Sequence, residues 1–433
     1  MGFGLRIPLP TVTARDFITG SRGLNRPSYA ADETVPGDAS GYISAVKRKR
    51  VGVLFGGRSS EHEVSVRSAA SVLANLDRKR YDSAAIYIDP DGRWILPSRP
   101  PDASTDAEAR EYVREQARSF RRDSEVVMPA RPAPDETLLV FSRGTAGSEE
   151  DAAPRSVREL HLDVAFPVLH GPYGEDGTIQ GLFELANVPY VGAGVMASAV
   201  GMDKSIMKVL FGARNLPTAE FELVTRHEWT AGAAAVVARL LRRFAFPVFV
   251  KPANLGSSVG ISRAQNEADL AASIDLAAQF DRKVLVEAAV PNAREIEVAV
   301  LGNERPEASV PGEIIPAEGC AFYDYEAKYT KDSGLLVPAP LTPEQADEAR
   351  RLAIEAYQAV DACGLGRVDF LFDRVAGAWY VSEINTIPGF TTISMYPKLW
   401  AATGVEYGAL LDRLIELAFE RHAAKQRLRT AQP

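Results

Sequence analysis

Two adjacent β-strands near the end of the chain constrain the fold of this sequence more than any other feature. The stretches Gly366–Asp373 and Trp379–Thr386 are rich in strand-forming residues and are separated by a short turn, which predicts a β-hairpin. If the hairpin is symmetric about Ala376, Asp369 lies directly opposite Glu383. Two facing carboxylates repel each other, so the hairpin predicts a cation between them.

Asn385 and Arg367 extend this charged face, because every second side chain of a strand points the same way. Asn385 shares a face with Glu383, and Arg367 shares a face with Asp369. Three oxygen ligands with open positions suit Mg²⁺ bound together with phosphates, and the arginine can stabilise a phosphoryl group or an oxyanion. From the hairpin alone, a solvated face with screened charges is the alternative.

The composition bounds the class of protein. With 433 residues, the chain is long enough for two or three domains. A net charge of -8 argues against a nucleic-acid binder. Cys320 and Cys363 have no CxxC spacing, which indicates neither disulfides nor a zinc site. No apolar run reaches the length of a membrane span, so we expect a cytoplasmic protein with no membrane or nucleic-acid partner.

The first third of the chain predicts an α/β domain with additions. Residues 1–48 mix Gly, Pro and charged residues without periodicity and are expected to be an extension outside the fold. A buried strand at Val51–Phe55 leads through a glycine loop into a helix, and Tyr81–Ile88 gives another strand. Residues 98–160 are expected to be an elaboration on this domain with one helix at Asp106–Phe120.

Two further strand ends carry polar residues. Leu162–Leu169 predicts a strand that ends at His170 beside a second glycine loop, where a ligand or a structural role for His170 is equally consistent with the local sequence. Lys251 ends another strand and precedes the small-residue loop 254–261, a combination that favours phosphate binding over a flexible turn. Glu287 and Glu295 fall at strand ends, where they can hold a ribose or an adenine, or do nothing.

With these pieces in order, the chain resembles the D-alanine-D-alanine ligases of the ATP-grasp superfamily. Eight ordered blocks carry the resemblance, and they lie at residues 54–65, 169–181, 194–204, 250–262, 294–303, 322–329, 366–373 and 383–391. The resemblance implies an α/β (α+β) fold in which an N-terminal parallel-sheet domain precedes two α+β domains that clasp ATP. The implied boundaries are 49–195, 196–290 and 291–425, with an insertion near 98–160 and a tail at 426–433.

The implied reaction joins two D-alanines. ATP phosphorylates the first carboxylate, and the amine of the second D-alanine displaces phosphate to give D-alanyl-D-alanine for peptidoglycan precursors. By the resemblance, two Mg²⁺ or Mn²⁺ ions are held by Asp369, Glu383 and Asn385. The residues that the resemblance assigns to ATP are Lys204, Lys251, Ser257, Ser258, Glu287, Ala289, Val290, Glu295 and Lys328.

The resemblance also assigns the amino-acid substrates. Glu61 would pair with the ammonium of the first D-alanine, close to His170. Glu61, Ser257 and Tyr329 would latch a mobile loop over the intermediate and exclude water. Tyr329 also favours an amine over D-lactate as the second substrate.

The remaining implied residues concern the second half of the reaction. Arg367, with a backbone amide near Gly389, would stabilise the tetrahedral oxyanion. Ser394 would bind the carboxylate of the second substrate. The apolar Met395 argues against D-serine as that substrate. The first domain resembles that of the family's larger members, so a homodimer is expected.

Two rival functions remain open. One keeps the fold and changes the second substrate to D-lactate or D-serine, and the other is a catalytically silent nucleotide-binding module. Loss of a metal ligand or of the oxyanion arginine would favour the silent module, and the sequence has lost neither. A Rossmann dehydrogenase is a weaker alternative, because the loop at Gly56-Gly57 lacks the GxGxxG spacing and no acidic ribose ligand follows at the expected distance.

Overall fold

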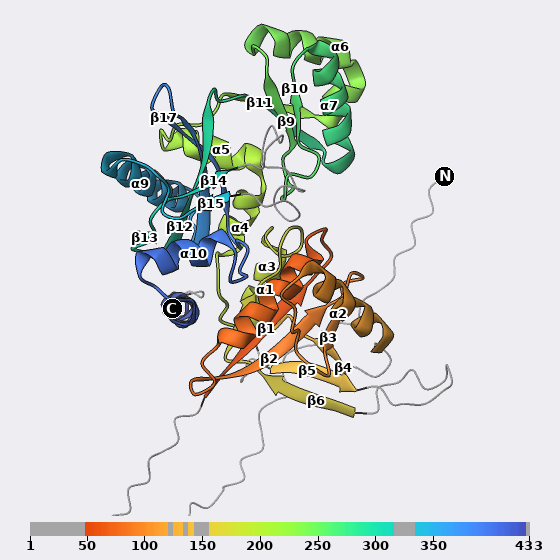
Figure 1. Cartoon of the computed structure of the whole chain (residues 1–433). Coiled ribbons are helices and arrows are strands. Elements are labelled where there is room, and N and C mark those ends of the chain that lie inside the picture. Colours follow the sequence, from red (N-terminus) through yellow and green to blue (C-terminus); the bar gives the residue numbers. More distant parts are fainter. Residues whose placement is uncertain (1–47, 120–123, 133–136, 143–155, 316–333, 430–433) are drawn as a thin grey trace, which may run out of the picture. The chain divides into compact units, whose positions relative to one another are not determined.

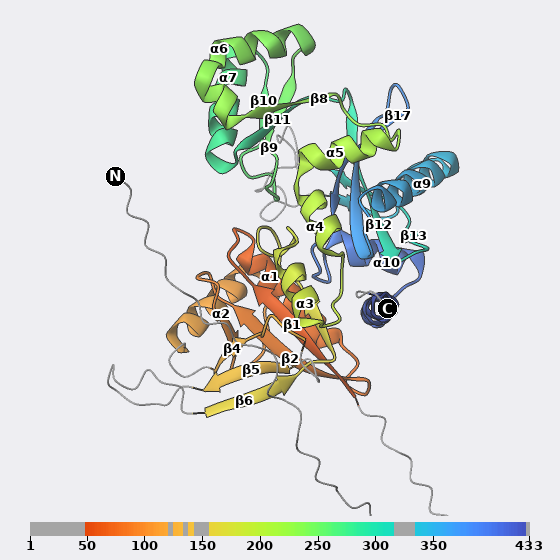
Figure 2. The same ribbon diagram turned by 180° about the vertical axis from the view of Figure 1, so that it is seen from behind.

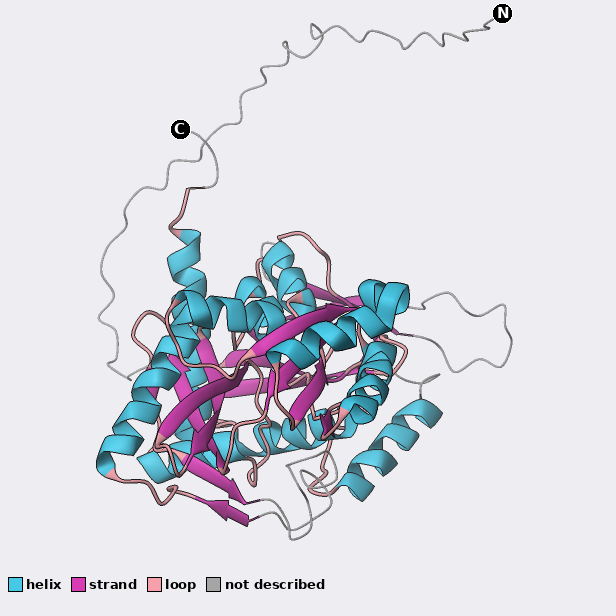
Figure 3. Ribbon diagram, turned by 90° about the horizontal axis from the view of Figure 1, so that it is seen from above, coloured by secondary structure: helices cyan, strands magenta, loops and turns pink. Residues whose placement is uncertain are grey.

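The described part of the chain forms three β-sheets in sequence order. A computed structural model describes residues 48–119, 124–132, 137–142, 156–315 and 334–429. Figure 1 follows these residues from Arg48 to the last helix, and Figure 3 shows the strands covered by helices. No helix of the described residues is long and apolar enough to cross a membrane. The proposed domain boundaries stay a prediction.

The first sheet has seven strands in the order β6-β5-β4-β3-β2-β1-β7. Its parallel part was predicted, because the buried apolar run of β1 is typical of strands covered on both faces and β1 pairs in parallel with β2 and β7. The other four strands pair antiparallel and extend one edge. The strands are β1 (Lys49–Gly56), β2 (Tyr81–Ile88), β3 (Trp94–Leu96), β4 (Ser124–Val127), β5 (Thr137–Ser142), β6 (Ser156–His161) and β7 (Val164–Pro167).

The elaboration at 98–160 is therefore more regular than its sequence indicates. The predicted helix is present as α2 (Asp106–Ser119), and the segment also supplies three edge strands that were not predicted. The outermost strand, β6, exposes four of its six residues, and such a strand lacks the apolar run that marks a buried one. The helices α1 (His62–Asn75) and α3 (Thr178–Ala186) complete this part.

The second sheet is antiparallel, with the order β10-β9-β11-β8. Its core joins the strands to two helices through Trp229, Leu240, Leu270 and Ile274, and Figure 1 shows both helices beside the strands. The elements are β8 (Phe221–Thr225), α6 (Arg226–Arg243), β9 (Val248–Pro252), β10 (Ser262–Ala264), α7 (Glu267–Phe280) and β11 (Lys283–Ala288).

The third sheet contains the predicted hairpin at its edge, in the order β15-β14-β12-β16-β17, with β13 on β12. Its strands are β12 (Ala293–Gly302), β13 (Glu307–Ala308), β14 (Gly312–Ile315), β15 (Gly334–Leu336), β16 (Gly364–Asp373) and β17 (Ala378–Asn385). Three helices pack on it in one core with Phe370 and Trp379, as Figure 2 shows. These helices are α4 (Val195–Met202), α5 (Lys204–Ala213) and α9 (Pro343–Ala359).

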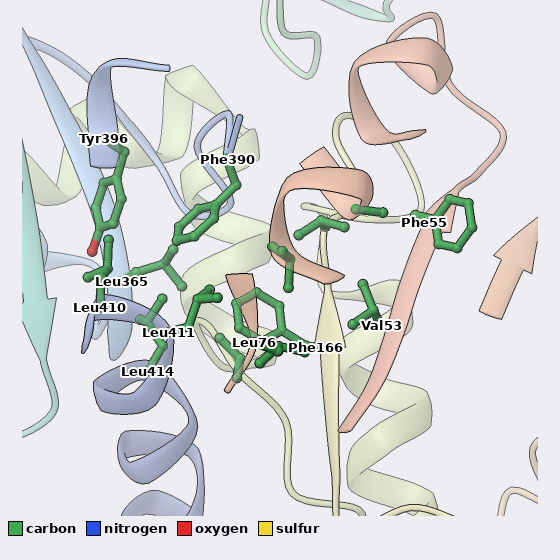
Figure 4. Close-up of a cluster of buried hydrophobic side chains, with 14 of the residues drawn as sticks. Val53, Phe55, Leu76, Phe166, Leu365, Phe390, Tyr396, Leu410, Leu411 and Leu414 are labelled. Carbon is green, nitrogen blue, oxygen red and sulfur yellow. The ribbon is translucent and has the colours of Figure 1, made fainter. Parts of the chain in front are cut away.

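The last two helices, α10 (Met395–Thr403) and α11 (Tyr407–Gln426), belong to a core shared with the first sheet. Figure 4 shows Phe166 and Phe390 between the leucines of α11 and Val53 of β1. The rings of Phe166 and Phe390 meet edge to face at 6.0 Å, a favourable arrangement for aromatic pairs. The loop that carries Phe390, directly after the hairpin, is thereby fixed against the first sheet.

The start of α9 agrees with the sequence and carries a stability prediction. The Thr342 hydroxyl accepts from Gln345 N at 3.3 Å, and Gln345 Oε1 accepts from Thr342 N at 3.0 Å, which completes a capping box behind Pro343. We expect Thr342→Ala to lower the free energy of unfolding by about 1 kcal/mol, measured by urea denaturation. Thr342→Ser keeps the acceptor and is the control. Equal stability of the two variants would contradict this role of the cap.

Candidate functional site

The hairpin pairs its charged residues as predicted, but its register is not uniform along the two strands. Asp369 pairs with Glu383 and Arg367 pairs with Asn385, so all four side chains share one face. Nearer the turn the register differs by one residue, and Phe370 pairs with Val381. A bulge at Ser382 absorbs the difference, and bulges often redirect side chains beside active sites.

Arg367 forms the centre of this face. Its guanidinium donates twice to Asp369, with Nε–Oδ1 and Nη2–Oδ2 distances of 2.6 Å. Its Nε also lies 3.0 Å from Glu297 Oε2 on the neighbouring strand. Burial alone would lower the pKa of Arg367, but the two carboxylates hold it well above its usual value. The side chains of Arg367 and Asp369 are only 15% and 17% exposed, so the alternative of a solvated face is wrong.

Lys204 connects this face to the small-residue loop. Its Nζ lies 3.1 Å from Glu383 Oε2 and donates to the Leu255 carbonyl at 2.9 Å. Its backbone N–H donates to the Ala253 carbonyl at 3.0 Å. The first residue of α5 is thus bound to the loop after β9 and to a carboxylate of the hairpin, which brings a predicted phosphate ligand beside a predicted metal ligand.

The donor set fits a hard divalent cation. Asp369 and Glu383 face each other across two strands, and Asn385 Nδ2 lies 2.9 Å from Asp369 Oδ2, so two carboxylates and an amide converge. Oxygen ligands of this kind suit Mg²⁺. Among the described residues no group of three or more His, Cys, Asp or Glu is arranged to hold a metal by itself.

A second buried charge cluster surrounds Glu287, at the end of β11. Lys208 Nζ lies 2.7 Å from Glu287 Oε1, and Lys251 forms an ion pair with Oε2. Burial raises the pKa of Glu287, but the two ammonium groups outweigh burial and lower it to about 2. One carboxylate between two lysines leaves a positive balance, as a site for nucleotide phosphates requires.

This cluster predicts how stability depends on pH. The pKa of Glu287 is lowered from 4.5 to about 2, so its stabilisation is complete above pH 4.5 and is lost as the pH falls toward 2. The shift corresponds to roughly 3 kcal/mol. We expect Glu287→Gln to be less stable than the parent protein at pH 6, with the difference narrowing toward pH 3. Urea denaturation across this range measures it.

A matched control exists on the same sheet. Glu220, directly before β8, pairs with Arg243, and its side chain is 56% exposed. The free energy of unfolding of Glu220→Gln should therefore differ from that of the parent by a small amount that is nearly independent of pH. A Glu287→Gln difference that is equally independent of pH would contradict the expected shift.

The other residues assigned to the nucleotide lie on β12 and directly after β11. Glu295 is on β12 and is half-buried. Ala289 and Val290 follow β11, and Ala289 N donates to the Pro247 carbonyl at 3.3 Å. The amide of Ala289 is thus already used within the protein.

The small-residue loop forms a hydrogen bond to Glu61, directly before α1. Ser257 Oγ donates to Glu61 Oε1, so two of the three predicted latch residues touch. Ser257 and Ser258 have φ of 51° and 57°, a left-handed conformation that is uncommon without glycine. A Cβ built at Gly256 would lie 3.2 Å from Glu61 Oε2, so the glycine allows the close approach. Tyr329 and Lys328 lie in 316–333, outside the described residues.

His170 has both ring nitrogens engaged. Nδ1 lies 3.0 Å from the Ile387 carbonyl, to which it donates, and Nε2 lies 3.0 Å from Ser68 Oγ. Burial lowers its pKa and keeps the ring neutral, so Nε2 accepts from the serine. The sequence left a ligand role and a structural role open for His170, and these hydrogen bonds support the structural role.

Glu175, a residue that was not predicted, lies beside these groups. Its Oε2 accepts from the Gly171 amide at 2.8 Å. Burial and the charge of Glu61 raise its pKa to about 8, although Arg367 opposes this. A carboxyl that is neutral near pH 7 can donate as well as accept.

The residues expected at the second amino acid surround the loop after the hairpin. Thr391 N donates to Ser394 Oγ at 3.1 Å, and the two hydroxyls lie 2.8 Å apart. A Cβ at Gly389 would lie 3.1 Å from Ser394 Oγ. Met395 is 6% exposed and packs in the core with Leu399 and Trp400, so its apolar character is also explained by packing.

Three charged residues escaped the sequence analysis. Lys208 lies four positions after Lys204 on one helix, and this spacing puts both lysines on the same face. The spacing is a signal by which the sequence could have identified Lys208 as a site residue. Glu297 faces Arg367 only because β12 pairs with β16, a pairing between distant segments. Glu175 lies in the glycine loop that follows β7, where no spacing marks it.

Comparison with known proteins agrees with this geometry. The model of the D-ala D-ala ligase N-terminus matches residues 50–193, and that of the C-terminus matches residues 210–416. The D-alanine--D-alanine ligase of Heliobacterium modesticaldum is 48% identical over 88% of this chain and 97% of its own length. That of Acetivibrio thermocellus is 45% identical over 87% and 97%.

Two solved structures are similar as well. The D-alanine-D-alanine ligase from Coxiella burnetii has a TM-score of 0.71 and 34% identity, covering 88% of this chain and 96% of that chain. The VanG D-Ala:D-Ser ligase from Enterococcus faecalis has a TM-score of 0.72 and 30% identity, covering 86% and 100%. With both family models matched and relatives of this identity over most of its length, the chain belongs to the D-ala D-ala ligase family, an ATP-dependent family of ligases.

Proposed function

We propose that this chain joins two D-alanines into D-alanyl-D-alanine at the expense of ATP, through a D-alanyl phosphate. The observation that carries the proposal is the convergence of Asp369, Glu383 and Asn385 with Lys204 on one sheet face. Phosphoryl transfer needs positioning and charge neutralisation more than covalent help, and this face supplies both.

In the first step the chain holds ATP and the first D-alanine in line. Lys204 and Lys251 bind phosphate oxygens, Ser257 and Ser258 supply donors from the loop, and Lys328 reaches the transferred group. Glu287, Glu295, Ala289 and Val290 hold the adenosine part. Glu61, which already accepts from Ser257, pairs with the ammonium of the first D-alanine. His170 keeps its loop in place through the Ile387 carbonyl.

Two Mg²⁺ or Mn²⁺ ions fit the donor set of Asp369, Glu383 and Asn385. When bound there, such ions neutralise the charge of the nucleotide phosphates. The protein's part is to keep both carboxylates aligned, which Arg367 does for Asp369 through two hydrogen bonds.

In the second step the amine of the second D-alanine attacks the acyl phosphate and phosphate leaves. Negative charge develops on the carbonyl oxygen, and Arg367 with the amide near Gly389 stabilises it. Ser394 holds the carboxylate of the second D-alanine, and Met395 lies beside it. Tyr329, together with Glu61 and Ser257, closes the site against water, which would otherwise hydrolyse the acyl phosphate. We also propose a homodimer that works in the cytoplasm.

The second substrate is the finer part of the proposal. D-serine is the second candidate, since one similar structure is a D-Ala:D-Ser ligase, and D-lactate is the third. In the test, D-alanine is mixed with equal amounts of D-[2-²H]alanine, D-serine and D-lactate as competing second substrates, and the products are identified by mass. We expect the dipeptide of D-alanine to be the main product. A majority of the D-seryl product would overturn the assignment while keeping the ligase chemistry.

A further inference from the structure

A cavity of about 270 Å³ lies on the first sheet and is lined in part by the loop after β1 and by the loop that carries His170. It is lined at the carboxyl ends of parallel strands, by Gly57 after β1, Ile88 at the end of β2 and Leu169 after β7. Ligands of open α/β sheets bind outside the carboxyl ends of the strands. Of its lining residues, only His170 has a part in the proposed reaction.

Its inner wall is apolar and ordered. Ile88, Leu169 and Ile179 are 6%, 3% and 6% exposed, and the half-buried Trp94 and Leu182 pack against the same core. Small-molecule sites are concave and mostly apolar, with a few polar groups that fix orientation. The wall can therefore accept an aromatic or branched apolar body.

A single fixed cation stands at the rim. The guanidinium of Arg58 lies 4.6 Å from the centroid of the Tyr173 ring, a cation–π distance. A Cβ at Gly92 would lie 2.9 Å from Arg58 Cδ, so this glycine makes room for the arginine stem. Within the described residues no carboxylate makes an ion pair with Arg58, and Asp91, which also lines the cavity, pairs with Arg93 at 3.6 Å.

The backbone around Tyr173 is built for this arrangement. Tyr173 has φ of 65°, a conformation that is rare for a bulky residue and that marks functional sites when the surroundings enforce it. Asp176 Oδ2 accepts from Tyr173 N at 2.8 Å and holds the turn. The ring, 47% exposed, is thereby presented to Arg58 at the mouth of the cavity.

We propose that this cavity binds a small organic anion with an aromatic or branched apolar body, whose charged group pairs with Arg58 and whose body contacts Trp94 and Leu169. We further infer that the ligand alters binding of the first amino acid. Arg58 is adjacent to Ser59, whose hydroxyl accepts from Glu61 N at 3.1 Å, and His170 lines the cavity. This second part rests on the proposed function, and the first does not.

The binding test uses 1-naphthylacetate, with the neutral 1-naphthylacetamide as the charge control, in isothermal titration calorimetry of the full chain. We expect saturable binding of the acid by the parent protein. The affinity should fall at least about tenfold when the amide replaces the acid, and likewise when Arg58→Gln replaces the parent, since a hydrogen bond to a charged group is lost in each case. Arg58→Lys should be intermediate. Arg99→Gln, whose partner Glu115 also lies outside the cavity lining, should bind like the parent protein.

Two results would overturn the site: no saturable binding of the acid up to millimolar concentration, or equal binding of the acid by the parent protein and a folded Arg58→Gln variant. Leu182→Phe narrows the cavity without touching the charge and should weaken the acid and the amide alike; unchanged binding by it would equally count against the cavity. For the coupling, the KM for D-alanine should shift with the acid in the parent protein but not in Arg58→Gln, and an unchanged KM would overturn that part. Because binding is measured without turnover, failure of the ligase assignment and failure of the site remain distinguishable.

Discussion

Arg367→Met is expected to lower kcat for ligation by about 100- to 1,000-fold, because the variant loses the donor placed for the tetrahedral oxyanion. It also leaves Asp369 and Glu297 without the guanidinium that both contact. Two buried carboxylates then repel each other, so the free energy of unfolding should fall by about 3 kcal/mol or more. Steady-state kinetics and urea denaturation measure the two effects.

The same sheet offers a control that separates catalysis from stability. Arg294 donates to Glu313 at 2.8 and 2.7 Å in the same two-point manner, and it lies opposite Phe372, five residues along β16 from Arg367. Arg294→Met should cost comparable stability and leave kcat within about threefold of the parent value. Arg367→Lys keeps the charge but not the paired geometry and should recover only part of the rate. Equal kcat losses in the two methionine variants would mean that Arg367 acts through stability alone.

Glu383→Gln is expected to have the second large effect. It removes one of two facing carboxylates and the partner of Lys204, so Mg²⁺ bound with the nucleotide is held by less charge. We expect kcat to fall by about 100-fold or more and the Mg²⁺ concentration for half-maximal activity to rise. Stability should change little, because the facing repulsion with Asp369 is also relieved.

The control for this substitution is Glu307→Gln, on the exposed position of β13, which should leave the Mg²⁺ dependence unchanged. A Glu383→Gln enzyme with the parent Mg²⁺ dependence would remove Glu383 from the metal site. Calorimetric titration of Mg²⁺ in the presence of a non-hydrolysable ATP analogue gives the same comparison without turnover.

The hairpin shows how far a local pattern can be trusted. The pairing of Asp369 with Glu383 was predicted from simple symmetry, and it is present because a bulge corrects a register that differs nearer the turn. A bulge leaves no reliable mark in a sequence. The capping box of α9, by contrast, is within reach of a sequence pattern, since its contacts span only three residues.

Features that depend on distant pairings were beyond prediction. Glu297 reaches Arg367 because β12 is the neighbour of β16, and sheet order is set by packing that no local spacing encodes. The strand β6 was missed because it is largely exposed, so the burial that marks strands in a sequence is absent there. The apolar run of β5 could have revealed that strand, since Leu138 and Val140 are buried. Lys208 was within reach, since helical spacing from Lys204 places it on the same face.

The central claim, that this chain couples two D-alanines through an acyl phosphate, is tested most directly with D-alanine carrying ¹⁸O in both carboxylate oxygens. The protein is incubated with ATP, Mg²⁺ and this substrate, and the dipeptide and the released phosphate are analysed by mass. The account predicts D-alanyl-D-alanine and one ¹⁸O atom in each phosphate released. Dipeptide formed with unlabelled phosphate, or phosphate released without dipeptide, would contradict it.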